Sequence, residues 1–214
     1  IPVILFSPED LKIVKSGPSE RRKFLDIELS QMERLYLYQL TNYNKILVQR
    51  NNLLKQIRFQ NNLIETLEAW DIQLVKYGSE VIKYREKFIK HLGEVCQKIH
   101  NKLTGGKEKI LLEYDRDVGY DSYLTELAKK RQKDLKYSTT TVGPHRDDIS
   151  FIVNGIDIRK YGSQGQQRTA ALSLKLAQIQ LMREVMKESP ILLLDDVLSE
   201  LDSNRKTYLL ESIK

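Results

Sequence analysis

The sequence has a single cysteine among its 214 residues, and this scarcity excludes two kinds of structure. Cys96 cannot form an internal disulfide or build a cysteine-based zinc site, so we expect a reducing compartment, the cytoplasm. Long hydrophobic runs are also missing: the longest span residues 1–6 and 191–194, far below the roughly 18 residues of a membrane helix. No secretory signal pattern is present, so a soluble protein without a membrane partner is predicted.

Charge of one sign is only slightly in excess, with 35 Lys and Arg against 29 Asp and Glu and a net charge of +6. Residues 19–103 hold 15 of the basic and 10 of the acidic side chains, so nearly all of the excess lies there. Such a segment can attract nucleic acid, although a charged helix face is more often only solvated. With 41% hydrophobic residues, the chain can form one or two domains with a core.

Proline and glycine are scarce in the same segment. Between Pro18 and Gly105 there is no proline and there are only two glycines, so the sequence predicts long helices. Residues at alternating intervals of three and four are mostly apolar from 29 to 57 and again from 67 to 98, so each segment has one apolar seam. Two such seams predict an antiparallel hairpin that turns near 61–62, with arms of roughly 60 Å.

Several aromatic residues and two of the three histidines lie in this predicted hairpin. We expect the aromatic side chains, His91 and His100 to be packing residues of the seams.

After residues 104–106, where a turn is expected, the periodicity changes. Strands and helices then alternate in the order strand 109–114, helix 122–135, Thr-rich strand 137–142, a hairpin at Asn154-Gly155, amphipathic helix 166–188 and strand 191–194. The last strand is entirely apolar, as expected for a central strand buried on both faces. A helical arm therefore interrupts an α/β lobe.

Two carboxylates follow the last strand directly. The sequence ILLLDD has the form of a Walker B element, in which a rigid strand holds Asp195 and Asp196 beside a phosphate site. The first carboxylate can hold Mg²⁺, usually through water, and the second can orient or deprotonate an attacking water. Many parallel strands end in aspartate, so the weight of this motif depends on its neighbours.

Polar segments lie on both sides of this strand in the sequence. Upstream, residues 163–167 (SQGQQ) begin a helix, where a hydroxyl, a glycine and free backbone N–H groups form an anion-binding end. Downstream, residues 199–202 (SELD) form a polar loop. The alternative for Ser163 and Gly165 is an ordinary helix cap.

This order of motifs resembles the ABC-type ATPases, with SQGQQ as the signature motif, ILLLDD as Walker B and SELD as the D-loop. The sequence is most similar to the RecF family, which has similar segments in the same order at residues 6–26, 140–148, 162–178 and 192–202. The resemblance therefore brackets nearly the whole chain.

The RecF resemblance implies an α/β fold: a partial ABC-type ATPase head interrupted by an antiparallel coiled-coil helical arm. Residues 1–18 would belong to the head and lead into the arm, residues 19–103 would form the arm, and residues 104–214 would form the C-terminal part of the head. SMC-like ATPases share this architecture, but their arms are usually much longer.

The resemblance also implies roles for individual residues. Asp195 would be linked to Mg²⁺, and Asp196 would be catalytic where most ABC ATPases carry glutamate, which implies slow ATP hydrolysis. Ser163 and Gly165 would contact the γ-phosphate of ATP held by a second subunit, so that ATP joins a homodimer. The remaining cofactor-binding residues would be Gln164, Gln166 and, in the D-loop, Asp202.

The phosphate-binding motif G-x-x-x-x-G-K-[ST] is absent from the sequence. Gly105-Gly106-Lys107 is followed by Glu108 and lacks the upstream glycine, so a turn is expected there. In the RecF family the phosphate loop precedes the matching part and the switch histidine follows it. We therefore interpret the chain, which begins with Ile1, as a piece of a longer protein, and we expect this piece to be almost inactive alone.

For the complete protein, the family implies an ATP-dependent recombination mediator in DNA repair, replication and the SOS response. ATP-driven dimerisation would clamp gapped DNA at single-strand/double-strand junctions and, with RecO and RecR, promote RecA loading. Two alternatives remain: a non-enzymatic protein-interaction module built on the coiled-coil arm, or another SMC-like ATPase.

Three further segments carry charged or polar side chains without a clear motif. Residues 143–148 (GPHRDD) predict a rigid turn with an ion pair of Arg146, or a contact from His145 or Arg146 to DNA or the arm. Ser7 to Asp10 lie where ABC folds place the Q-loop but contain no glutamine. The basic arm residues expected to help hold DNA are Lys83, Arg85, Lys87 and Lys90.

Overall fold

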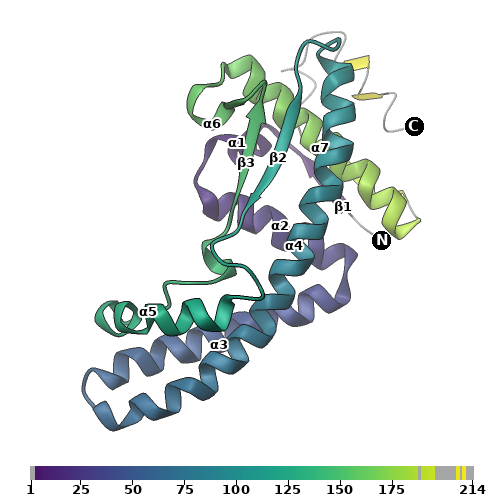
Figure 1. Cartoon of the computed structure of the whole chain (residues 1–214). Coiled ribbons are helices and arrows are strands. Elements are labelled where there is room, and N and C mark those ends of the chain that lie inside the picture. Colours follow the sequence, from purple (N-terminus) through teal and green to yellow (C-terminus); the bar gives the residue numbers. More distant parts are fainter. Residues whose placement is uncertain (1–2, 188, 196–205, 208, 211–214) are drawn as a thin grey trace. The chain divides into compact units, whose positions relative to one another are not determined.

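The computed structural model describes residues 3–187, 189–195, 206–207 and 209–210 (Figure 1). They form a mixed α/β structure that is mostly helical. None of the described helices is both long and apolar enough to cross a membrane.

The helices and strands follow one another in the order β1 (Val3–Phe6), η1 (Pro8–Asp10), α1 (Leu11–Lys15), α2 (Pro18–Met32), α3 (Arg34–Ile57), η2 (Asn61–Thr66), α4 (Leu67–Leu103), β2 (Ile110–Asp115), α5 (Tyr123–Tyr137), η3 (Pro144–Arg146), β3 (Asp148–Val153), β4 (Ile156–Asp157), α6 (Ile158–Tyr161), α7 (Gln164–Met186) and β5 (Ile191–Leu194).

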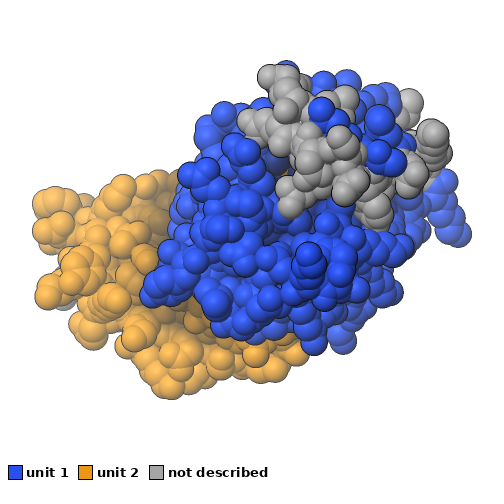
Figure 2. Space-filling view, turned by 90° about the horizontal axis from the view of Figure 1, so that it is seen from above, with its two compact units in different colours: residues 1–24, 88–114, 149–214 blue, residues 25–87, 115–148 orange. Residues whose placement is uncertain are grey.

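The chain divides into two compact units (Figure 2). The first unit is Ile1–Phe24, Phe88–Tyr114 and Ile149–Lys214. The second unit is Leu25–Lys87 and Asp115–Asp148.

The first unit contains two small sheets. Strand β1 pairs in parallel with β5, and β2, β3 and β4 form a three-stranded sheet. Strands β3 and β4 are antiparallel, with Val153 opposite Ile156. Asn154 and Gly155 between them have φ values of 50° and 81°, the left-handed pair that a tight two-residue hairpin requires. The predicted Asn-Gly hairpin is confirmed.

Helix α7 is the centre of the first unit. Residues 171–179 are buried without interruption, so the helix is covered all round rather than along one stripe, and the prediction of an amphipathic helix is wrong. Small side chains such as Ala170 and Ala177 allow neighbouring elements to pack closely against it. Cys96 is also buried in this unit, and burial raises the pKa of its thiol.

Strand β5 forms at the predicted residues, but it is more exposed than expected. Ile191 and Leu193 are 49% and 50% exposed. Among the described residues, β5 pairs with β1 alone and only Leu192 of the strand is half-buried, whereas a central strand has both faces covered. The expected burial on both faces is therefore not observed.

The second unit is built on the antiparallel helices α3 and α4. Tyr36 packs edge-on against Tyr84 with ring centroids 5.8 Å apart, and Tyr38 packs against Tyr77 at 6.4 Å. The partner number in α4 falls as the number in α3 rises, which is the pattern of an antiparallel pair. The chain turns between them at residues 58–66, around the predicted position.

The helical segment has a break that the sequence did not predict. Glu33 is extended, with φ −132° and ψ 100°, and separates α2 from α3. The break allows the Tyr36 hydroxyl to donate a hydrogen bond to Asp26 Oδ1 at 2.5 Å. In a continuous helix, residues ten apart are about 15 Å apart along the axis and cannot form this bond.

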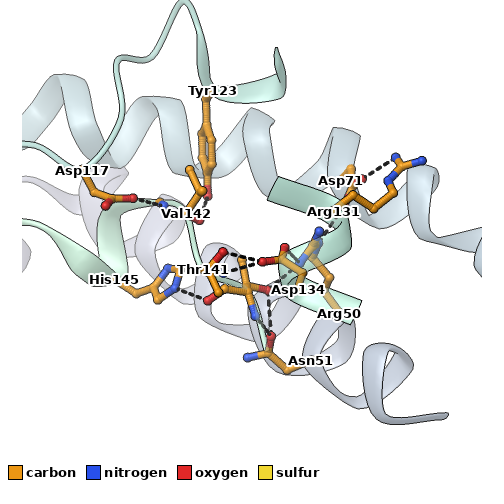
Figure 3. Close-up of polar contacts among 12 residues, drawn as sticks. Arg50, Asn51, Asp71, Asp117, Tyr123, Arg131, Asp134, Thr141, Val142 and His145 are labelled. Atoms are coloured by element: carbon orange, nitrogen blue, oxygen red, sulfur yellow. Dashed lines mark hydrogen bonds and ion pairs between the residues drawn. The ribbon is translucent and has the colours of Figure 1, made fainter. Parts of the chain in front are cut away.

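Arg50 lies fully buried in the seam of this hairpin (Figure 3). Its Nε donates to Asp71 Oδ1 at 2.7 Å, and its Nη1 donates to Asp134 Oδ2 at 2.8 Å. Asp71 also accepts from Arg131 at 2.8 Å. Because Asp134 belongs to α5, this network fastens α5 to the hairpin, an arrangement that periodicity alone did not reveal.

Residues 137–142 do not form the predicted strand. Helix α5 ends at Tyr137, and Ser138 takes a left-handed conformation with φ 52°. The backbone N of Thr140 donates to Asn51 Oδ1 at 2.7 Å, and that of Thr141 donates to Asp134 Oδ1 at 2.9 Å. These side-chain acceptors replace the ladder of a neighbouring strand.

Arg85 is the second buried arginine of this unit. Its guanidinium donates to Asp26 at 2.8 Å and to Asp147 at 3.2 Å. The expectation that Arg85 helps to hold DNA is therefore wrong: it is 2% exposed and belongs to the internal ion pairs.

We predict that Arg50→Met lowers the free energy of unfolding by about 3–5 kcal/mol, because Asp134 would remain buried without its cation. Lys55→Met is the matched control: Lys55 is exposed on the same helix, so its loss should change stability by less than about 0.5 kcal/mol. Urea unfolding followed by circular dichroism measures both. Equal effects of the two variants would contradict a stabilising role of the buried ion pairs.

Candidate nucleotide-contacting site

The start of α7 carries four of the predicted site residues. Ser163 is the N-cap: its Oγ accepts from the backbone N of Gln166 at 3.2 Å, and the backbone N of Ser163 donates to Gln166 Oε1 at 3.0 Å. This reciprocal capping box satisfies two backbone donors. The predicted helix entry is confirmed, with α7 beginning at Gln164.

Three residues of this helix start are exposed: Ser163, Gln164 and Gly165. The backbone N–H groups of Gln164 and Gly165 belong to the first helical turn, and neither has a hydrogen-bond partner among the described residues. The helix dipole adds partial positive charge at this end. The helix start can therefore accept an anionic group.

The two glycines next to Ser163 differ in their surroundings. A Cβ added to Gly162 would lie 2.6 Å from both Ile158 Cβ and Ile158 O, so this turn excludes larger side chains. A Cβ added to Gly165 would meet only Ser163 Oγ, at 3.8 Å. The packing of the chain explains Gly162 but not Gly165, whose open surroundings leave room for an approaching group.

The short helix α6 before Gly162 is fixed to the neighbouring hairpin. Asp157 caps α6 by accepting from the backbone N of Arg159 at 3.0 Å, and Arg159 Nη2 also donates to Ser150 Oγ at 3.1 Å. The hydrogen bond from the Arg159 guanidinium lowers the pKa of Asp157. Gln167 Nε2 donates to Ile158 O at 2.7 Å and thereby holds α7 against α6.

A second set of contacts reaches the helix start from Glu108. Gln166 Nε2 donates to Glu108 Oε1 at 3.0 Å, and Glu108 Oε2 lies 3.2 Å from His100 Nε2. The sequence did not predict Glu108 as part of this site, and it predicted His100 only as a packing residue. The sequence shows only a histidine near the end of a predicted helix, and this does not identify the residues that His100 contacts.

Asp195 lies at the end of β5, where its backbone N donates to Phe6 O at 2.9 Å. Asp195 is exposed. Asp196 and Asp202, the expected catalytic and D-loop residues, lie outside the described residues. A single exposed carboxylate at a strand end suits Mg²⁺, which is usually bound through one or two carboxylates, water and substrate phosphates.

The segment after β1 joins the strand end to the middle of α7. The backbone N of Ser7 donates to Asp10 Oδ2 at 2.8 Å, and Asp10 Oδ1 lies 3.3 Å from Lys175 Nζ. Lys175 follows Ser163 by twelve residues, or about 18 Å of helix. Asp10 therefore meets α7 about three turns after the helix start, while Asp195 is fixed to the end of β1.

The turn at residues 143–147 contacts the helical hairpin of the second unit. The Tyr43 hydroxyl lies 2.6 Å from His145 Nδ1, and His145 Nε2 lies 3.1 Å from Thr140 O. Because a carbonyl only accepts, Nε2 carries a ring proton, and in the neutral imidazole Nδ1 accepts from the Tyr43 hydroxyl. The expected contact of His145 with the arm is confirmed.

The ion pair of this turn differs from the expected one. It is formed by Asp147 with Arg85, while Arg146 is exposed. The described residues hold no group of three or more His, Cys, Asp or Glu side chains that would bind a metal ion.

No protein-family model matches the sequence. Curated relatives do match: the DNA replication and repair proteins RecF of Agathobacter rectalis and Lachnoclostridium phytofermentans are each 56% identical to this chain, over 211 and 213 residues. The RecF protein of Lachnospira eligens is also 56% identical, over 215 residues. These matches cover 99–100% of this chain but 58–59% of the relatives, so the chain spans less than two thirds of their length.

Two solved structures are similar along the same part. The recombination mediator protein RecF with ATP, from the RecFOR pathway, has a TM-score of 0.93 and 41% identity, covering 99% of this chain and 59% of that chain. The form with ATPγS has a TM-score of 0.92 and 40% identity, covering 100% of this chain and 60% of that chain. Because sequence and structure match from one end of this chain to the other, the chain belongs to the RecF family of DNA replication and repair proteins.

Proposed function

We propose that this chain is the arm-bearing part of an ATP-dependent DNA-binding recombination mediator. Residues 1–18 and 104–214 contribute to an ABC-type ATPase head, and residues 19–103 form the antiparallel arm. ATP joins two heads into a homodimer that clamps gapped DNA, and slow hydrolysis releases it. RecO and RecR act with the dimer to promote RecA loading.

The exposed start of α7 carries this proposal. Ser163 and Gln166 cap each other, so the helix start is held in one conformation before any ligand arrives. Gly165 leaves open space beside the first-turn N–H groups, which suits the approach of a phosphate from another subunit. The RecF relatives solved with ATP and ATPγS support a nucleotide as the source of that phosphate.

The proposal divides the predicted residues between two half-sites in each chain. Ser163, Gln164, Gly165 and Gln166 serve the nucleotide of the partner subunit, while Asp195 serves the nucleotide of its own subunit through Mg²⁺. Ser163 caps the start of α7, whereas Asp195 follows β5, so the two sets of residues belong to different elements. Mg²⁺ held at Asp195 would supply positive charge to the phosphates.

Two residues of the proposal take their roles from the RecF resemblance alone. Asp196 orients the attacking water, and Asp202 contacts the opposing half-site through the D-loop. Both lie outside the described part of the chain.

We predict that Ser163→Arg in the full-length protein leaves ATP binding nearly unchanged but abolishes ATP-driven dimerisation. The arginine places bulk and length where the opposing phosphate docks, and the loss of the cap alone costs only about 1 kcal/mol. Ser163→Ala, which removes the cap without adding bulk, is the control. Light scattering and nucleotide titration measure the two properties. Parallel loss of ATP binding and dimerisation would show that the signature motif is assigned wrongly.

We further predict opposite outcomes for the two glycines. Gly162→Ala should destabilise the protein, because the added methyl meets Ile158 at 2.6 Å. Gly165→Ala should keep or slightly raise stability, since alanine is the better helix former by about 1 kcal/mol, yet it should weaken dimerisation. Thermal unfolding and light scattering on both variants test this. Unimpaired dimerisation of Gly165→Ala would mean that no group approaches Gly165 closely.

Exposed lysines on α5 support the DNA-binding part of this proposal. On α5, Lys130, Lys133 and Lys136 are exposed and recur every three residues, so they form one stripe on the helix. The arm cluster is weaker than its sequence indicates, because Arg85 is internal and Lys83 pairs with Glu80 at 2.8 Å. We therefore place the phosphate-contacting lysines of the second unit on α5.

We predict that reversing Lys130, Lys133 and Lys136 to Glu weakens DNA binding by the ATP-bound full-length protein. The slope of log affinity against log salt should fall by about one unit for each lysine–phosphate pair that the reversal removes. The matched control reverses three lysines that are exposed on α3 and α4: Lys45, Lys55 and Lys76. The control should keep the wild-type dependence of affinity on salt. If the α5 variant also keeps it on a gapped duplex, the lysines of α5 are only solvated.

A further inference from the structure

We infer that Glu108 and His100 position Gln166, and that they thereby link the last turns of α4 to the surface that contacts the partner's nucleotide. The inference rests on the proposed function and extends it to residues with no predicted role in it. Neither residue touches ATP; both act through Gln166.

The contacts form a continuous chain within the first unit. Gln166 Nε2 donates to Glu108 Oε1 at 3.0 Å, and Glu108 Oε2 meets His100 Nε2 at 3.2 Å. His100 Nδ1 lies 2.9 Å from Ser173 Oγ. The chain of contacts therefore leaves α7 at Gln166, passes through Glu108 and the end of α4, and returns to α7 two turns later.

The number of protons on each group determines which atoms in this chain of contacts donate and which accept. Ser173 Oγ donates its single proton to Thr169 O at 2.7 Å, so it must accept from His100 Nδ1. His100 Nε2 then faces a carboxylate oxygen, and a hydrogen bond there requires one shared proton. One proton therefore lies between His100 Nε2 and Glu108 Oε2, with the His100 side chain fully buried and that of Glu108 21% exposed.

The orientation of the Gln166 amide is fixed by two partners. Its Oε1 accepts from the backbone N of Ser163 at 3.0 Å, so its Nε2 must point toward Glu108. A flipped amide would place a donor against a donor and leave the Glu108 carboxylate without its hydrogen bond. Glu108 therefore selects the conformation in which Gln166 completes the cap at Ser163.

A merely structural role for Glu108 makes a different prediction from positioning. Loss of packing or stability would affect the whole unit, including ATP binding. Loss of positioning would affect the helix start alone, so ATP binding and dimerisation would separate. A neutral side chain of equal length should also restore the function.

Glu108→Gln is that conservative variant. The introduced amide oxygen would still accept from Gln166, and the introduced amide nitrogen would donate to a neutral His100 that keeps its proton on Nδ1. Glu108→Ala removes both hydrogen bonds, and Glu108→Asp keeps the charge with a shorter reach. Glu113→Ala is the matched control, because Glu113 is an exposed glutamate close by on β2.

The test measures ATP binding, ATP-driven dimerisation and thermal unfolding of the full-length protein and these variants. We expect Glu108→Ala to weaken dimerisation about tenfold, the effect of losing a hydrogen bond to a charged group, with ATP binding unchanged. Glu108→Asp should also be impaired, while Glu108→Gln and Glu113→Ala should resemble the wild type. If Glu108→Ala unfolds, the test rests on the two other variants: Glu108→Asp should dimerise less well than Glu108→Gln.

Wild-type dimerisation of Glu108→Ala overturns the inference. Impaired dimerisation of Glu108→Gln together with normal dimerisation of Glu108→Asp also overturns it, because the charge of Glu108 would then matter and its position would not. Ser163→Arg in the same experiment separates this inference from the proposed function. If Ser163→Arg dimerises normally, the proposed function fails. If it does not dimerise while Glu108→Ala does, only the role of Glu108 is overturned.

Discussion

A guanidinium that is buried in a helical hairpin requires carboxylates, and in this chain they come from distant parts of the sequence. Arg50 meets Asp71 across the hairpin and Asp134 from α5, while Arg85 meets Asp26 and Asp147. Leaving either charge without a partner costs several kcal/mol, so folding of the hairpin and docking of α5 and the 143–147 turn depend on each other. The second unit is therefore specified as much by charge as by apolar periodicity.

The first unit is organised by a different constraint. Helix α7 is covered along residues 171–179, and its start is capped and exposed. Burial of the helix body fixes the direction in which the first turn points, and α6, Gln167 and Glu108 fix its local geometry. A rigid body with an open end is what a site needs if it must meet a group from outside without first being ordered.

The sequence was informative where structure depends on neighbouring residues. The Asn154-Gly155 hairpin, the cap at Ser163 and the strand at 191–194 each follow from local rules, and all three form. It was misleading where a distant partner decides. Residues 137–142 look like a strand until Asn51 and Asp134 take their backbone donors, and Arg85 looks like a surface charge until Asp26 and Asp147 surround it. The role of Glu108 depends on a residue 58 positions away, which no local pattern contains.

The burial of Cys96 has a practical consequence for studying this protein. The chain has one thiol, and that thiol is enclosed and has a raised pKa, so little reactive thiolate is available to solvent. A cysteine introduced at an exposed position such as Gln164 would be the accessible one in this part of the protein. Fluorophores or spin labels could then report on the helix start in solution without first removing the native cysteine.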